Sequence, residues 1–92
     1  MKSLYDLKII SVEFPKLHFI KIVLSDNSSF SADLSDDFKD LPVFPKSFQE
    51  WSLGKIGNGK FSIEWPSGFD VHFDHIVELS YIQNSLKVPG TF

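Results

Sequence analysis

The chain contains no cysteine and no arginine, and each absence weighs against a class of function. Without cysteine there is no disulfide and no thiolate metal site, so a packed core has to supply the stability. Without arginine the chain lacks the planar fork that binds phosphate and guanine through two parallel hydrogen bonds. All nine basic residues are lysines, scattered along the sequence, and the formal net charge is −3. Nucleic-acid binding by the isolated domain is therefore disfavoured.

Long apolar runs are absent too, and no segment approaches the roughly 20 apolar residues of a membrane span. The first residues soon reach the acidic side chain of Asp6 and lack a secretory apolar block. We therefore expect a soluble, cytoplasmic protein that does not bind membranes. The length fits a single domain over residues 1–92.

Large aromatic side chains are plentiful, and the most informative segment that carries them is residues 61–73. It reads as two alternating strands joined by a Pro-Ser-Gly turn. A three-residue loop pairs Trp65 with Phe69 and places all apolar side chains of both strands on one face, whereas a two-residue loop mixes them with polar ones. We predict a type I turn with Pro66 at its first corner and Gly68 in the left-handed conformation.

Other apolar runs predict more strands. Leu7–Phe14 and Leu17–Leu24 are rich in β-branched and apolar residues, which is typical of buried strands. A turn follows the second run, and pairing Phe30 with Leu24 aligns the apolar face of the returning strand.

Two helices are expected. Ser47 stands three residues before Glu50, which is the spacing of a capping box, and predicts a short middle helix, with a plain turn as the alternative. Asp74 occupies an N-cap position. Helical spacing follows at Leu79, Ile82 and Leu86 and predicts a C-terminal helix. The fold class is therefore α+β, with about six strands in antiparallel hairpins, a short middle helix and a C-terminal helix.

The predicted hairpin at Pro66 also places Glu64 opposite Asp70, on the face away from the apolar stripe. Two carboxylates across an antiparallel ladder repel each other. A cation between them would relieve the repulsion, and His72 adds a nitrogen donor on the same face. Glu64, Asp70 and His72 are therefore weak candidates for a metal or acid–base site. The alternative is a solvated face on which nearby lysines dilute the repulsion.

The C-terminal helix is expected to cover one face of a thin sheet. Phe14, Phe19 and Val23 then line a second apolar surface, which favours self-association or a protein partner. Alternatively, the loop Leu41–Phe48 folds over that side, for which Phe44 and Phe48 are suited. The sequence leaves both arrangements open.

Three segments, in order, resemble a known family: Ile22–Asn27 with Ala32–Ser35, Phe48 with Trp51 and Leu53, and Ile63–Val71 with its Trp65-Pro66-Ser67-Gly68-Phe69-Asp70 run. Together they resemble the small prokaryotic domain of unknown function 2442 family. In that pattern Asn27 replaces a turn glycine and Ser67 replaces an asparagine. The resemblance implies an α+β domain, found alone or beside a DNA-binding helix-turn-helix domain, and some members are encoded next to another small protein. It implies no catalytic residue.

The leading hypothesis is a non-enzymatic protein-interaction domain from a prokaryote, one half of a toxin–antitoxin-like two-protein module. One alternative is a DNA-binding antitoxin or repressor component. Another is a weak metal-binding or small-enzyme site on the face of Glu64, Asp70 and His72. No motif predicts a cofactor.

Overall fold

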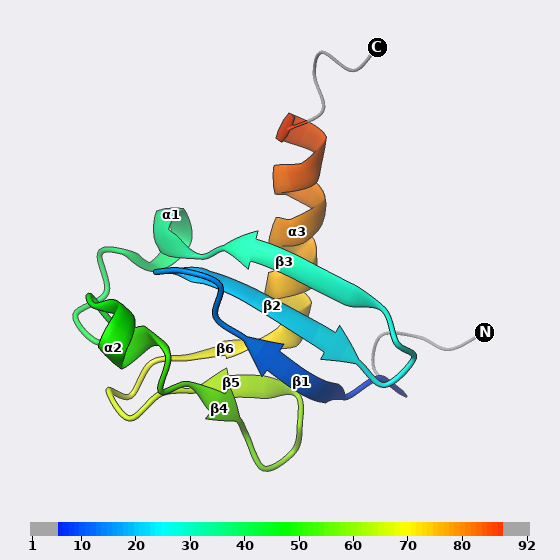
Figure 1. The fold of residues 1–92 in the computed structure, drawn as a ribbon, viewed down its shortest axis with the longest axis horizontal. Coiled ribbons are helices and arrows are strands. Elements are labelled where there is room, and N and C mark those ends of the chain that lie inside the picture. Colours follow the sequence, from blue (N-terminus) through cyan, green and yellow to red (C-terminus); the bar gives the residue numbers. More distant parts are fainter. Residues whose placement is uncertain (1–5, 88–92) are drawn as a thin grey trace.

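The computed structural model describes residues 6–87, with side chains described as far as residue 84 (Figure 1). In chain order its elements are β1 (Ile9–Glu13), β2 (Phe19–Leu24), β3 (Ser29–Asp33), α1 (Ser35–Phe38), α2 (Phe48–Trp51), β4 (Lys55–Ile56), β5 (Ser62–Glu64), β6 (Asp70–His72) and α3 (Phe73–Lys87). The predicted α+β class, the antiparallel hairpins, the short middle helix and the C-terminal helix are confirmed.

The strands form two three-stranded antiparallel sheets, in the orders β1-β2-β3 and β4-β5-β6. The sheets meet where β1 passes β4, and there the Ile9 amide donates to the Lys60 carbonyl at 2.8 Å. The long helix α3 packs mainly on β3 and continues past that strand (Figure 1). Both sheets and α3 therefore enclose one core between them.

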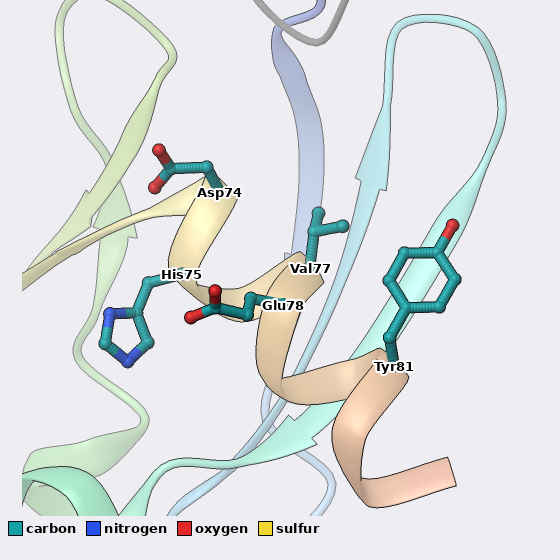
Figure 2. Close-up of a pocket in the computed structure, with 5 residues that line it drawn as sticks. All are labelled: Asp74, His75, Val77, Glu78 and Tyr81. Carbon is teal, nitrogen blue, oxygen red and sulfur yellow. The ribbon is translucent and has the colours of Figure 1, made fainter. Parts of the chain in front are cut away.

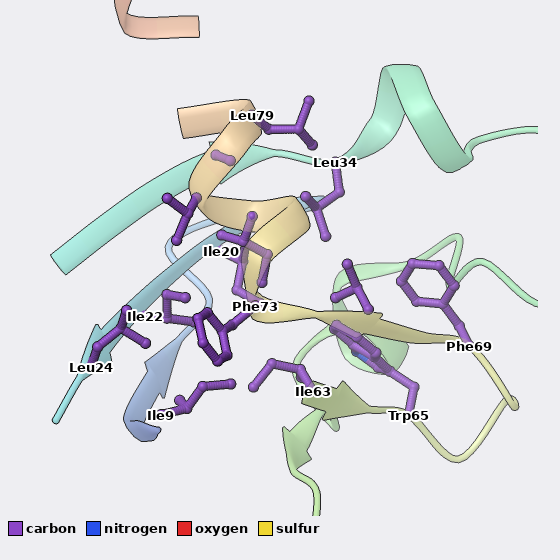
Figure 3. Close-up of a cluster of buried hydrophobic side chains, with 14 of the residues drawn as sticks. Ile9, Ile20, Ile22, Leu24, Leu34, Ile63, Trp65, Phe69, Phe73 and Leu79 are labelled. Atoms are coloured by element: carbon purple, nitrogen blue, oxygen red, sulfur yellow. The ribbon is translucent and has the colours of Figure 1, made fainter. Parts of the chain in front are cut away.

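The core combines aliphatic side chains from both sheets with aromatic ones from the residues that flank the Pro66 turn and from the helices (Figure 3). Ile20, Ile22 and Leu24 alternate along β2 and are fully buried. Ile63 and Phe73 lie next to them, and Trp65 and Phe69 extend the core toward the Pro66 turn (Figure 3). This alternation is what a strand with one buried face requires.

The predicted hairpin around Pro66 is confirmed. Trp65 donates its amide to the Phe69 carbonyl at 2.9 Å, and the Gly68 amide donates to the Trp65 carbonyl at 3.0 Å. Gly68 has φ +99°, the left-handed conformation that glycine adopts without steric cost. Trp65 and Phe69 are both buried, with ring centroids 5.1 Å apart. The loop therefore has three residues, and its apolar side chains share one face.

Phe61 departs from that face. It precedes the first residue of β5, and Lys60 before it has φ 64°, so the chain turns out of the sheet there. The Phe61 side chain is 37% exposed and stacks on the His72 ring with an interplanar angle of 4°. Its carbonyl still accepts the Phe73 amide at 2.9 Å, so only the side chain leaves the core.

The predicted pairing of Phe30 with Leu24 is wrong by two residues, because Phe30 faces Ile22. Asn27, with φ 71°, closes a three-residue turn, and the Asp26 carboxylate accepts the amide two residues later at 3.0 Å. This turn is tighter than expected. Because the shift is an even number of residues, the apolar face is unchanged.

The strand β2 begins at Phe19, later than the predicted start at Leu17, because His18 occupies a turn with φ 66°. The His18 Nε2 donates to the Pro45 carbonyl at 2.7 Å, and its ring lies 4.4 Å from that of Phe44. These contacts hold the imidazole against the loop before α2.

The second apolar surface does not form as predicted. Phe14 packs edge-on against Trp51, with centroids 5.7 Å apart, while Phe19 and Val23 are half-buried on the other side of β2. The loop before α2 turns Phe44 into the core, where it is buried against Trp51 with ring centroids 5.6 Å apart, whereas Phe48 is 47% exposed and does not cover the core as predicted. The loop and α2 therefore close the end of the core that α3 does not reach.

The helix α3 begins at Phe73, so Asp74 lies in its first turn rather than at the N-cap, and its charge still suits the helix dipole there. The buried face of α3 consists of Phe73, Ile76, Val77, Leu79 and Ser80. Ile82, predicted in the apolar stripe, is 50% exposed, and the side chain of Leu86 lies outside the described residues. Among the helices of residues 6–87, none has the length and apolar character that crossing a membrane requires.

Candidate functional site

Two stacked tryptophans fix the Pro66 turn relative to α2. The rings of Trp51 and Trp65 lie 4.7 Å apart with an interplanar angle of 21°. The Trp65 indole N–H donates to the Trp51 carbonyl at 2.6 Å, and the Trp51 N–H donates to the Phe19 carbonyl at 2.8 Å. Both buried donors are satisfied, so the stack links the second sheet, α2 and β2 into one rigid unit.

Beside this stack lies a cavity of about 210 Å³. Its lining, which we call the Pro66 surface, consists of Pro45, Glu50, Leu53, Trp65, Pro66 and Ser67. Leu53 is 52% exposed, whereas Trp65 is almost fully buried. An exposed aliphatic side chain thus stands beside a firmly held aromatic ring and two prolines, which is the usual composition of a recognition pocket.

Val43 extends the apolar rim of the Pro66 surface. The Ser67 hydroxyl donates to the Val43 carbonyl at 2.7 Å, and the Val43 side chain, 40% exposed, lies close to Gly68. The one charged side chain of the surface is partly engaged, because the Glu50 carboxylate accepts the Lys46 amide at 3.3 Å. The rim therefore presents mainly apolar groups on a fixed backbone.

The carboxylate face has the predicted register. Glu64 lies opposite Asp70 in β6, and on its other side it lies opposite Lys55 in β4. The His72 Nδ1 lies 3.0 Å from an oxygen of Asp74. Within residues 6–84, no three histidine or acidic side chains come together in a group that could hold a metal ion. The metal or acid–base hypothesis for Glu64, Asp70 and His72 therefore remains a prediction from sequence without a supporting cluster.

A further cavity, of about 510 Å³, lies along the start of α3 (Figure 2). It is lined by Asp74, His75, Val77, Glu78 and Tyr81. The His75 Nε2 lies 2.8 Å from a carboxylate oxygen of Asp37, which joins α3 to α1. Among the described residues, no hydroxyl is hydrogen-bonded to His72 or His75, although Ser62 lies opposite His72 in the pairing of β5 with β6.

Sequence reasoning missed the Pro66 surface. Its walls come from the loop before α2, from the residues after α2 and from the turn before β6, and no local pattern announces that they meet. Val43 gave a partial signal, because it is an apolar residue in the loop between Pro42 and Pro45. The resemblance also included Leu53, although it assigned no role to it.

Comparison of the chain with protein-family models, with curated proteins and with solved structures finds no match. The resemblance to the domain of unknown function 2442 family therefore stays an expectation from the sequence.

Proposed function

We propose that the protein is a non-enzymatic interaction domain that binds another protein through the Pro66 surface. The observation that supports this proposal is the exposed Leu53 beside a cavity of about 210 Å³ lined by Trp65 and two prolines. A partner would contact the exposed side chains of Leu53 and Val43, with the nearly buried Trp65 ring behind them in the cavity wall.

The rigidity of the surface strengthens this proposal. The hydrogen bonds of both indoles and the Ser67–Val43 hydrogen bond hold the cavity walls in one geometry before any partner arrives. A preorganised site loses little conformational entropy on binding. An apolar side chain of the partner would fill the cavity, with Leu53 and Val43 covering it at the rim.

The resemblance noted in the sequence supports a place for the protein in a two-protein module. Some members of that family are encoded next to a second small protein, which is the natural candidate partner. On this proposal the domain acts in a prokaryotic cytoplasm as one half of a toxin–antitoxin-like pair. DNA contact, where the module makes any, would then fall to the partner or to the complex.

Affinity capture from a lysate of the source cells tests the proposal. The wild-type chain is compared with Leu53→Glu and with the control Ile10→Glu, because Ile10 is equally exposed at 54% but lies outside the Pro66 surface. We expect one protein to be retained by the wild type and by the control, and its recovery to fall about tenfold or more with Leu53→Glu. Equal recovery with all three chains, or none above a blank resin, would contradict the proposal.

A further inference from the structure

The strand β3 exposes backbone groups along its outer edge. The Leu24 amide donates to the Ser28 carbonyl, and the Leu34 amide donates to the His18 carbonyl, so the even-numbered residues of β3 bond to β2. The N–H and C=O groups of the odd-numbered residues therefore point away from the sheet. We call Ser29, Phe30 and Ser31 the β3 edge.

Gln83 of α3 closes the far end of this edge. Its side-chain oxygen accepts the Asp33 amide at 2.8 Å, and its side-chain nitrogen donates to the Asp33 carbonyl at 2.8 Å. The Gln83 side-chain amide thus makes the two hydrogen bonds with Asp33 that a neighbouring strand would make. Among the described residues, no group plays this role at Ser29 or Ser31, and both are exposed.

We propose that the β3 edge pairs with the β3 edge of a second copy, antiparallel and centred on Phe30. Ser29 of one copy then lies opposite Ser31 of the other, and every outward N–H and C=O of these residues finds a partner. A pairing centred on Ser31 would place Ser29 of one copy opposite Asp33 of the other, whose outward N–H and C=O are already bonded to Gln83. A pairing centred on Ser29 would require Asn27, which is committed to the turn with φ 71°.

The side chains suit this pairing. In the antiparallel register the two Phe30 side chains face each other on the inner side of the joined sheet, at a position where opposed Cα atoms lie about 4.5 Å apart. Tyr81, 64% exposed, already packs against Phe30 with centroids 5.9 Å apart and stands over β3 in Figure 2. The two phenylalanines and two tyrosines would therefore form one aromatic cluster across the symmetry axis.

The β3 edge also lacks the usual protection against pairing. Exposed edge strands commonly carry a lysine, another charge or a proline, whereas the Ser-Phe-Ser sequence has none of these. The β3 edge therefore brings no charged side chains of the two copies into opposition. The helix α3 continues past β3 and would lie over the second copy (Figure 1). Because the paired segment is short, we expect a weak, concentration-dependent dimer.

Sedimentation of the full chain over a range of concentrations is the first test, with Ser31→Pro against Ser31→Ala. Proline removes only an N–H that points away from β2, so the fold is kept, and alanine keeps that N–H. We expect the wild type and Ser31→Ala to dimerise, and Ser31→Pro to raise the dissociation constant about tenfold or more. Circular dichroism of each variant confirms that its fold is intact.

Introduced cysteines test the register independently, because the chain has none of its own. Ser29→Cys and Ser31→Cys lie opposite each other in the dimer, with Cα atoms about 5.5 Å apart, which suits a disulfide. We expect a mixture of the two variants to form a disulfide dimer under mild oxidation far faster than either variant alone.

Three outcomes would overturn this proposal: a wild type that stays monomeric at every concentration, a Ser31→Pro variant that is folded yet dimerises like the wild type, or a mixture of cysteine variants that cross-links no faster than each alone. A monomer that instead binds an added strand-forming peptide would assign the β3 edge to a different protein. The Leu53→Glu variant should dimerise like the wild type, so failure here and failure of the Pro66 surface are distinguishable.

Discussion

Gly54 lies against the edge of the tryptophan stack, where no larger residue fits. A Cβ atom at this position would stand 2.6 Å from the Trp65 ring and 2.9 Å from the Phe14 ring. Both rings are held by other contacts, since Trp65 stacks on Trp51 and Phe14 packs edge-on against both indoles. The backbone at Gly54 therefore approaches both rings closely, next to Leu53 of the Pro66 surface.

Gly54→Ala should therefore lower the free energy of unfolding by about 1–3 kcal/mol, because the rings have no room to move aside. Gly59→Ala is the matched control, since its Cβ would meet only the exposed Phe61 ring, at 3.0 Å, which is free to shift. Urea unfolding followed by tryptophan fluorescence measures both variants. Equal stability of the two would show that the ring packing around Gly54 is looser than described.

Glu64 lies between Asp70 and Lys55, so removing each of these two neighbours should change the free energy of unfolding in opposite directions. Asp70→Ala removes a charge opposite Glu64 and should leave the free energy of unfolding unchanged or raise it by up to about 0.5 kcal/mol. Lys55→Ala removes the lysine on the other side of Glu64 and should lower it by a similar amount. Both effects should fade in high salt, as urea titrations at two salt concentrations would reveal. A large loss of stability in Asp70→Ala, together with lost binding of a titrated metal ion, would instead support the metal hypothesis.

Residues whose conformation depends on their immediate neighbours could be predicted from the sequence. Pro66 and Gly68 are one such case, because a type I turn with a left-handed third residue needs only the local chain. His18 is the opposite case. The steric cost of its left-handed conformation is offset by contacts with Pro45 and Phe44. Both residues lie far along the sequence, so no local pattern predicts these contacts.

At the scale of elements, the β2–β3 and β5–β6 hairpins are both built on three-residue loops with a left-handed residue at the end, Asn27 in one and Gly68 in the other. Sequence alternation fixed which face of each strand is buried, because only the parity of the register matters for that. It could not fix the register itself in the β2–β3 hairpin, where an error of two residues leaves every side chain on the same face.

The first residue of α3 and the direction of its buried face were not predicted correctly, because both depend on the sheet that α3 follows. The helix follows β6 directly, so its first residue, Phe73, belongs to the core of the hairpin as well as to the helix. That junction places Ile76 and Val77 on the buried face and rotates Ile82 outward. A helical period predicts the spacing of such a face, but the neighbouring sheet decides its direction.

Gln83 joins α3 to the edge of the first sheet, and its removal should loosen that edge. Gln83→Ala deletes both hydrogen bonds to Asp33, so we expect a loss of about 1–2 kcal/mol in the free energy of unfolding. The Asp33 amide should also exchange its hydrogen faster. Asn84→Ala is the control, because Asn84 is exposed and no hydrogen bond of its side chain is present in the described part. Unchanged exchange at Asp33 would contradict this account of the edge.

At the scale of the whole molecule, the distribution of charge separates the interaction hypothesis from the DNA-binding one. The described lysines lie on different strands, turns and helix flanks: Lys8, Lys16, Lys21, Lys39, Lys46, Lys55 and Lys60. Nucleic-acid binding needs several cations on one face, since each neutralised phosphate contributes through the release of counterions. With a net charge of −3, long-range electrostatics disfavour association of the isolated chain with DNA.

The isolated chain should therefore show no binding to duplex DNA at moderate salt by fluorescence anisotropy. Any weak signal at low salt should vanish as salt rises, without preference for one sequence over another. Tight binding to one DNA sequence that survives moderate salt would favour the repressor hypothesis instead.

The central claim is that the Pro66 surface contacts a second protein, and site-specific photo-cross-linking in the source cells tests it most directly. A photoreactive amino acid replaces Leu53 in one strain and the exposed Asn58, outside the Pro66 surface, in a control strain. The account predicts one discrete adduct from position 53, containing a different protein, and none from position 58. No adduct from position 53, or the same adducts from both positions, would contradict it.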